Sequence, residues 1–446
     1  MSNTLINNAT IVNEGKSYKG SLLIKDEKIA ATGNIPEREI PRNHKTIDAT
    51  GLLLLPGVID CHVHFREPGM TVKGDLFTES IAAAAGGITS FMDMPNTKPS
   101  TVTLEALENK YRIASEKSLI NYSFYIGATN DNLDEILKAD PAKVCGIKLF
   151  LGSSTGNMMV DSDQTLRDLF RHARIAIAAH CEDEGIIKAN TEQFRQQYGD
   201  DITFAMHPDI RSREACLKSS SFAVGLAEEF GTRLHVCHLS TADETNLFSN
   251  EIPLKDKRIT AEACAHHLWF DDSYYPALGS LIKVNPAIKA KADRDALRAA
   301  VNSDKIDIIA TDHAPHTARE KSGAYLRSPS GAPMVQHSLP LMMELWHKKI
   351  FTIEKIVEKM CHNPAILFNI KERGFIRKGY MADLVLVNPY DVQTVSKGNT
   401  LYRCGWSPLE SEELKSKVVT TIINGSTVYD CGQINYNSRG QRLIFE

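Results

Sequence analysis

The sequence has no run of basic residues and no apolar stretch long enough to cross a bilayer. Its 446 residues carry a formal net charge of −4. The longest strongly apolar stretches, such as residues 51–59, fall far short of the roughly 20 residues that a membrane-spanning helix needs. The first residues also lack the charged and apolar regions of a signal peptide. We therefore expect neither nucleic acid nor a membrane as a partner.

Cysteine is present but follows no pattern. The nine cysteines form an odd number without regular spacing, and several lie inside apolar runs, as Cys237 and Cys264 do. Such thiols are typical of a reduced, cytoplasmic protein. Nearly all of them are expected to be buried small hydrophobic residues.

The glycine-rich phosphate fingerprint of a doubly wound α/β sheet is missing as well. In the middle of the chain, short apolar runs alternate with helix-like segments, which predicts βα units and a parallel sheet. About eight such units over roughly 300 residues fit a closed (β/α)8 TIM barrel; an open doubly wound sheet is the alternative. The predicted strands are residues 52–59, 88–92, 122–126, 145–150, 175–179, 233–237 and 306–310, and the predicted helices include residues 78–85 and 293–301.

Both ends of the chain instead predict short β-strands. Apolar and polar residues alternate within residues 5–30, 382–387 and 418–429, and the Asn424-Gly425 pair is typical of a hairpin turn. We expect residues 1–54 and 366–446 to form one small β-sandwich domain, and residues 55–365 to form the metal-dependent barrel.

Metal-ligating side chains stand at the ends of five predicted strands, where barrel enzymes place their reactive groups. His62 and His64 are two positions apart, so both side chains point to one face of a strand. Imidazoles and a carboxylate suit Zn²⁺, with Mn²⁺ or Co²⁺ as alternatives. Taken alone, His62 and His64 could be structural or surface residues, His180 and His238 could be core histidines, and Asp312 could be a helix cap, but together they predict a metal site. The candidate ligands are His62, His64, Lys148, His180, His238 and Asp312.

Lys148 is the unusual member of this set. A protonated lysine repels cations and cannot bind a metal, whereas a neutral amine can add CO₂ to form a carbamate. That anion has two oxygens and can bridge two metal ions. The alternative interpretation of Lys148 is a salt bridge at the end of a strand.

These motifs together resemble the cyclic amidohydrolase branch of the amidohydrolase superfamily, over nearly the whole chain. The resemblance implies two Zn²⁺ ions per subunit, bridged by carbamylated Lys148 and a hydroxide. It implies that Asp312 is both a ligand and the catalytic base, and that the protein is a homodimer or larger. An aspartate transcarbamoylase is a candidate partner. The matching blocks are residues 56–64, 84–89, 146–148, 310–316 and 379–385.

Within that branch, residues 64–69 and 94–97 are similar to dihydroorotases, which interconvert N-carbamoyl-L-aspartate and dihydroorotate in pyrimidine biosynthesis. The resemblance implies that Arg66 and Asn96 hold the substrate carboxylate, and a planar guanidinium suits that role. A structural salt bridge to Glu67 or Glu79 is the alternative for Arg66. Further implied substrate contacts are Asn285, His316, Ser330, Gly331 and, in a lid over the site, Thr155.

Two departures keep other activities open. Lys148 stands where many single-function bacterial relatives carry an aspartate and resembles the hydantoinase pattern, so hydantoins, dihydropyrimidines and allantoin are alternative substrates. Residues 331–337 depart from the expected glycine-hydrophobic-glutamate pattern, which affects contacts to the substrate ring. A catalytically inactive scaffold would have lost ligands, and the His-x-Glu and Pro-Cys-x-x-Cys signature of nucleic-acid deaminases is absent.

Overall fold

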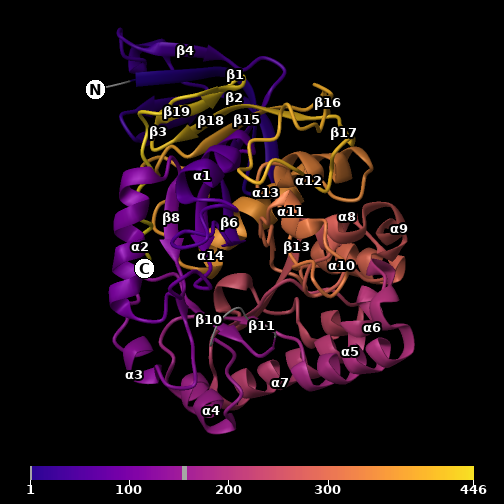
Figure 1. Ribbon diagram of the computed structural model, residues 1–446. Helices are drawn as coiled ribbons and strands as arrows, with labels where there is room; N and C mark the ends of the chain where they lie inside the picture. The colour runs from indigo at the N-terminus through magenta and orange to yellow at the C-terminus, as the bar shows by residue number, and fades with distance from the viewer. Residues whose placement is uncertain (1–2, 153–157) are drawn as a thin grey trace.

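A nine-stranded sheet joins the two ends of the chain in the computed structural model, which describes residues 3–152 and 158–446. Figure 1 shows the indigo N-terminal strands and the yellow C-terminal strands together at the top of the view. The strand order is β20-β19-β18-β15-β5-β1-β2-β3, and β4 pairs with β1. The strands are β1 (Asn3–Asn13), β2 (Lys16–Lys25), β3 (Lys28–Gly33), β4 (Lys45–Asp48), β5 (Leu53–Pro56), β15 (Leu384–Asn388), β18 (Lys417–Ile423), β19 (Ser426–Asp430) and β20 (Gln433–Ile434).

The middle of the chain forms two parallel sheets, in the orders β6-β7-β8 and β14-β13-β12-β11-β10-β9. They meet at both edges, because β8 continues into β9 through Tyr125, and Val63 of β6 forms a parallel bridge with His313 beyond β14. All carboxyl ends of these strands therefore point the same way. The strands are β6 (Val58–Val63), β7 (Ile88–Asp93), β8 (Asn121–Phe124), β9 (Ile126–Gly127), β10 (Ile147–Phe150), β11 (Ile177–His180), β12 (Leu234–Val236), β13 (Ile259–Cys264) and β14 (Ile308–Ala310).

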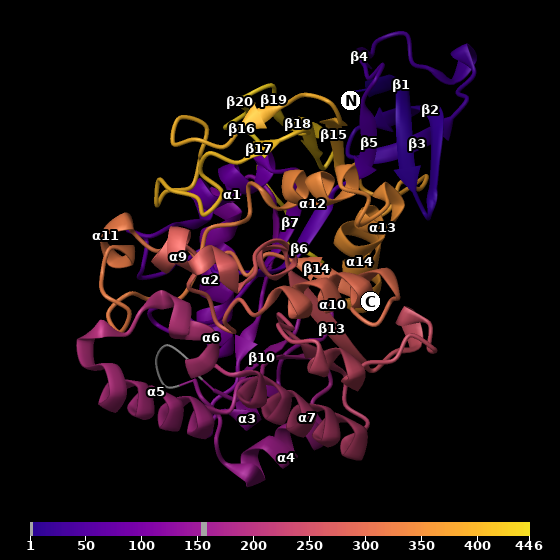
Figure 2. The ribbon, with the colours of Figure 1, turned by 90° about the vertical axis from the view of Figure 1, so that its right-hand side faces the viewer.

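Helices connect and surround these strands, and Figures 1 and 2 show α4, α5 and α7 at the end of the molecule opposite the terminal sheet. Local signals set their ends: Asp75 accepts from the Thr78 amide to begin α1, and Ser212 begins α7 in the same way. The α-helices are α1 (Leu76–Ala85), α2 (Leu104–Lys117), α3 (Leu133–Ile136), α4 (Asp163–His172), α5 (Glu184–Tyr198), α6 (His207–Ile210), α7 (Arg213–Phe230), α8 (Ala265–Trp269), α9 (Tyr275–Leu278), α10 (Lys291–Asn302), α11 (Ala318–Lys321), α12 (Ser338–His347), α13 (Ile353–Val357) and α14 (Asn363–Leu367).

The predicted strand at residues 52–59 is two strands, which corrects the sequence interpretation. Its first half, β5, belongs to the terminal sheet, and its second half begins β6 of the parallel region. The break is at Gly57, whose backbone lies so close to Thr89 that a Cβ would stand 2.1 Å from the Thr89 Oγ1 atom. One continuous apolar run therefore crosses from the terminal sheet to the parallel sheet, and it stays apolar throughout because both sheets bury it.

A buried polar cluster connects the terminal sheet to the parallel strands. Asn121 at the start of β8 donates to Asp383 Oδ2 (3.2 Å) and accepts from Asn424 Nδ2 (2.8 Å). Arg373 pairs with the same aspartate. The site-bearing strands are thus fixed to a sheet formed from both chain ends.

Two further observations concern membrane-spanning helices and the state of the cysteines. Among the described residues, no helix combines the length and apolarity needed to cross a bilayer. All nine cysteines are unpaired, and seven of them are buried.

Candidate active site

The structure brings the six candidate ligands together in one cavity of about 300 Å³ at the carboxyl ends of the parallel strands. His62 lies in β6 and His64 directly follows that strand. Lys148 lies in β10 and His180 ends β11. His238 and Asp312 each stand two residues beyond a strand, β12 and β14 respectively.

The candidate ligands form two adjoining halves. In one, the Nε2 atoms of His62 and His64 lie 3.3 and 3.1 Å from Asp312 Oδ1. In the other, His180 Nδ1 faces His238 Nε2 at 2.9 Å. The two halves adjoin, because the rings of His62 and His238 are 5.3 Å apart. Lys148 is fully buried at this site, with Nζ 3.3 Å from Cys237 Sγ.

The charge states of His64, His180, His238 and Asp312 fit a cation at the centre, whereas the neighbouring carboxylates Glu262 and Asp312 outweigh burial and raise the pKa of His62. Burial lowers the pKa of His64 to about 4 and also lowers the pKa values of His180 and His238. Burial would raise the pKa of Asp312, but the charge of His62, together with His64 and His238, outweighs it and holds that pKa well below its ordinary value. Neutral imidazoles and an ionised carboxylate are the forms that bind metals.

Three residues of the site have a left-handed backbone. Arg66, His238 and Asp312 have φ values of 69°, 37° and 46°, in the left-handed region that residues with a side chain rarely adopt. Such conformations cost on the order of 1–3 kcal/mol each and persist where the surroundings fix them. Here they direct the three side chains into the cavity.

Two buried glutamates, which the sequence analysis did not single out, orient the histidines. Glu262 Oε1 in β13 accepts from His62 Nδ1 at 2.8 Å and from the His238 amide at 3.1 Å. Glu182 Oε2 lies 3.0 Å from His180 Nε2 and also pairs with the buried Arg211. Their signals in the sequence were a charged residue within an apolar strand and a carboxylate two residues after a histidine.

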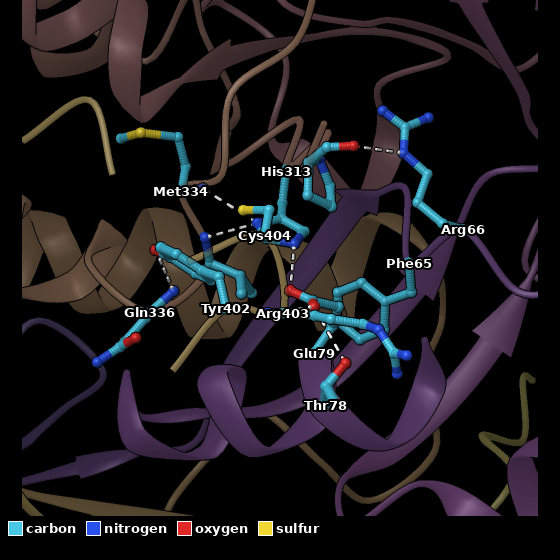
Figure 3. A network of polar contacts seen from close by, with 12 residues as sticks. Phe65, Arg66, Thr78, Glu79, His313, Met334, Gln336, Tyr402, Arg403 and Cys404 are labelled. Atoms are coloured by element: carbon cyan, nitrogen blue, oxygen red, sulfur yellow. Dashed lines mark hydrogen bonds and ion pairs between the residues drawn. The ribbon is translucent and has the colours of Figure 1, made fainter. Parts of the chain in front are cut away.

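A polar network fixes the segment that carries Asp312, as Figure 3 shows. His313 Nε2 bonds to Glu79 Oε2 at 2.9 Å, and His313 Nδ1 accepts from the amide of Met334 at 3.0 Å. Glu79 also accepts from the Arg403 amide at 3.1 Å. Residues far apart in the sequence thus hold the chain immediately after Asp312.

Arg66 is buried beside the ligands, and its contacts are to neutral groups. Its Nε donates to the Pro315 carbonyl at 3.0 Å, and its Nη2 lies 3.2 Å from His316 Nε2. Burial lowers the pKa of Arg66 to about 10. Within the described residues Arg66 forms no salt bridge, because Glu67 pairs with Lys117 and Glu79 with His313.

The other implied substrate residues differ in how free their polar groups are. Asn96 Oδ1 already binds His64 Nδ1 at 2.7 Å, so Asn96 also orients a candidate ligand. Asn285 Oδ1 has no hydrogen-bond partner among the described residues and lines the cavity. The Ser330 carbonyl lies 3.0 Å from His316 Nε2, and both backbone groups of Gly331 are bonded, to the Lys283 carbonyl and to Lys321 Nζ. Thr155 lies outside the described residues.

The fold and this site define a member of the amidohydrolases. Residues 53–428 match the Amidohydrolase family, so the chain belongs to that family. Dihydroorotases from Methanosarcina mazei, Pyrococcus furiosus and Bacillus pumilus are each 31% identical to the chain. The alignments cover 91%, 97% and 97% of this chain, respectively, and 90%, 96% and 100% of the three relatives.

Solved structures agree with this assignment. An L-hydantoinase (dihydropyrimidinase) from Arthrobacter aurescens aligns with a TM-score of 0.92 at 26% identity, covering 98% of both chains. A dihydropyrimidinase from Brevibacillus agri aligns with a TM-score of 0.88 at 24% identity, covering 100% of this chain and 99% of its own, and shows the likeness of fold. The chain is therefore a cyclic amide hydrolase.

Proposed function

We propose that this enzyme is a dihydroorotase, which reversibly cyclises N-carbamoyl-L-aspartate to dihydroorotate in pyrimidine biosynthesis. Its parallel strands would close into a (β/α)8 barrel over residues 55–365, with residues 1–54 and 366–446 forming a small β-sandwich domain. A homodimeric or larger assembly in the cytoplasm, with an aspartate transcarbamoylase as a candidate partner, belongs to the same proposal.

The observation that carries the proposal is the buried guanidinium of Arg66. A buried cation is costly unless it is paired, and the contacts of Arg66 within the described residues are a carbonyl and an imidazole. Dihydroorotate carries a ring carboxylate, which a guanidinium binds bidentately. Simple hydantoins, dihydrouracil and allantoin have no such group.

The site fits two zinc ions. His62, His64 and Asp312 would hold one, His180 and His238 the other, and a carbamylated Lys148 would supply a further anionic ligand. Bound metal ions would supply Lewis-acid polarisation of the amide carbonyl and a water-derived nucleophile at neutral pH. An observation of this structure supports the fit: one ligand atom from each of His62, His64 and Asp312 lies within 4.8 Å of the other two, which is close enough for one metal ion.

Within this proposal the chain's own residues perform three tasks. Arg66, together with Asn96, holds the substrate carboxylate, and Asn285 offers an unused acceptor to a ring N–H. Asp312 is ionised before the reaction begins. During hydrolysis it accepts a proton from the attacking water at a carboxylate oxygen and passes this proton to the departing ring nitrogen. During cyclisation it removes the proton from the ureido nitrogen instead.

A hydantoinase-like or allantoinase-like cyclic amidohydrolase is the second candidate. Lys148 at the bridging position and the TM-score of 0.92 to an L-hydantoinase favour it. Arg66 distinguishes the two candidates, because a hydantoin would leave this buried guanidinium without a carboxylate.

The deciding experiment measures loss of dihydroorotate by its ultraviolet absorbance, with hydantoin, dihydrouracil and allantoin in parallel. We expect turnover of dihydroorotate alone, abolished by a chelator and restored by zinc. Arg66→Ala should lower kcat/KM by at least about 30-fold, since truncating one partner of a buried charge pair costs 2–5 kcal/mol. Arg439→Ala, at an exposed arginine, is the control. Turnover of hydantoin or dihydrouracil in place of dihydroorotate would contradict the proposal and leave the family assignment intact.

A further inference from the structure

Two arginines stand side by side at the amino ends of the parallel strands, opposite the active-site end. Arg233 directly precedes β12 and Arg258 directly precedes β13. These strands are parallel, with Leu234 aligned to Ile259, and the Leu234 amide donates to the Arg258 carbonyl at 2.8 Å. Neighbouring strands lie about 4.8 Å apart, so two aligned residues project like charges from adjacent backbone positions.

No ion pair compensates this like-charge arrangement within the described residues. Arg233 donates to the Leu367 carbonyl and Arg258 Nη1 to the Gly231 carbonyl at 2.6 Å. Burial, and then the charge of Arg258, lower the pKa of Arg233. Lys257, the residue before Arg258, does have an ion pair, because its Nζ lies 2.7 Å from Asp307. Local arrangements that oppose stability are expected at functional sites.

The two arginines line a cavity of about 410 Å³, a size typical of small-molecule sites. It shares no lining residue with the active-site cavity. Lys255 adds a third cation, and Asp256 is the one carboxylate in the lining. Apolar side chains, including Leu254 and Ile366, complete the wall. With Lys257 neutralised by Asp307, the cavity carries an excess of two positive charges.

We propose that this cavity binds a small phosphate-bearing anion. A phosphate group carries close to two negative charges and three acceptor oxygens, which matches two adjacent guanidinium forks. The phosphate would lie between Arg233 and Arg258, with Lys255 at its edge. The organic part of the ligand would pack against the apolar wall. The site is separate from the chemistry of the amide hydrolase.

Isothermal titration calorimetry of the metal-loaded full chain tests this inference, with adenosine monophosphate and pyrophosphate as probes at constant ionic strength. We expect saturable binding of at least one probe at submillimolar concentration. Arg233→Gln and Arg258→Gln should each weaken it by at least about tenfold, because each removes charge-assisted hydrogen bonds. Arg439→Gln is the matched control, since Arg439 also donates to backbone carbonyls, those of Glu116, Tyr436 and Ser438.

Thermal unfolding keeps the test independent of misfolding. Without ligand, Arg258→Gln should change the Tm little, because relief of the repulsion offsets the loss of its hydrogen bond to the Gly231 carbonyl. With the binding probe present, the wild type and the Arg439 variant should gain more stability than the Arg233 and Arg258 variants. Binding that survives in Arg66→Ala supports the new site. The inference is overturned if neither probe binds, if the Arg233 and Arg258 variants bind as the wild type does, or if Arg66→Ala alone abolishes binding.

Discussion

Replacing Glu262 by glutamine tests how the site is oriented, because this side chain contacts both halves of it. The carboxylate is 1% exposed and holds His62 Nδ1 at 2.8 Å and the His238 amide at 3.1 Å. Burial would raise the pKa of Glu262, but the charge of His62 and the hydrogen bonds of His235 and His62 outweigh burial and hold that pKa well below its ordinary value. The bond to Nδ1 leaves His62 Nε2 directed at Asp312 and the cavity.

Glutamine keeps the size of the side chain and removes its charge. Loss of such a carboxylate behind a metal-bound histidine typically costs 10- to 100-fold in metal affinity, which corresponds to about 1.4–2.8 kcal/mol. We expect zinc affinity to fall by that factor. The measurement is competition with a chromogenic chelator at fixed pH, and the absorption spectrum of the cobalt-loaded protein gives a second readout.

The matched control is Glu413→Gln, which removes the same charge from an exposed position in β17 (Glu413–Leu414). Its zinc affinity should equal that of the wild type. If Glu262→Gln bound zinc within twofold of the wild type and kept the same cobalt spectrum, the orienting role of Glu262 would be refuted.

Three further predictions concern stability. Gly57→Ala should destabilise the protein by about 1–3 kcal/mol, because its Cβ would stand 2.1 Å from Thr89 Oγ1. Gly225→Ala, at an exposed site in α7 with no atom within 4 Å of the added Cβ, should instead stabilise it by about 0.5–1 kcal/mol. Urea unfolding of both variants checks the pair, and equal effects would contradict the reasoning. Glu182→Ala should lower the free energy of unfolding by about 3–5 kcal/mol, because the buried Arg211 loses the Glu182 carboxylate. Glu229→Ala, which removes an exposed ion pair with Arg167, is the control. A similar urea midpoint for the two variants would show that the buried pair does not stabilise the fold. Burial lowers the pKa of Lys321 from 10.5 to about 7. Between these two pH values the unfolded chain therefore binds more protons than the folded protein, so the contribution of Lys321 to stability rises from pH 7 to pH 10. Lys321→Met should flatten the rise of the urea midpoint over that range, and an unchanged slope would show that Lys321 is not its source.

Local patterns predicted the strands that carry the site, and the structure contains them with small shifts of their ends. Periodicity fails where one apolar run serves two layers, as at Gly57, because both layers bury their strands fully. β13 was not among the predicted strands, since its sequence Ile259–Cys264 includes Glu262 and lacks a continuous apolar run.

The sequence by itself determined which side chains are candidate ligands and the end of the sheet at which they meet. Parallel strands share one carboxyl end, so histidines, a lysine and an aspartate placed there had to converge. Only the tertiary structure decided what lies behind and beside them. Glu262 reaches His62 across 200 residues of sequence, Asn96 bonds to His64, and Arg66 faces neutral groups instead of a neighbouring glutamate. These contacts join side chains from separate strands and loops, and no local spacing along the chain encodes the distances between them.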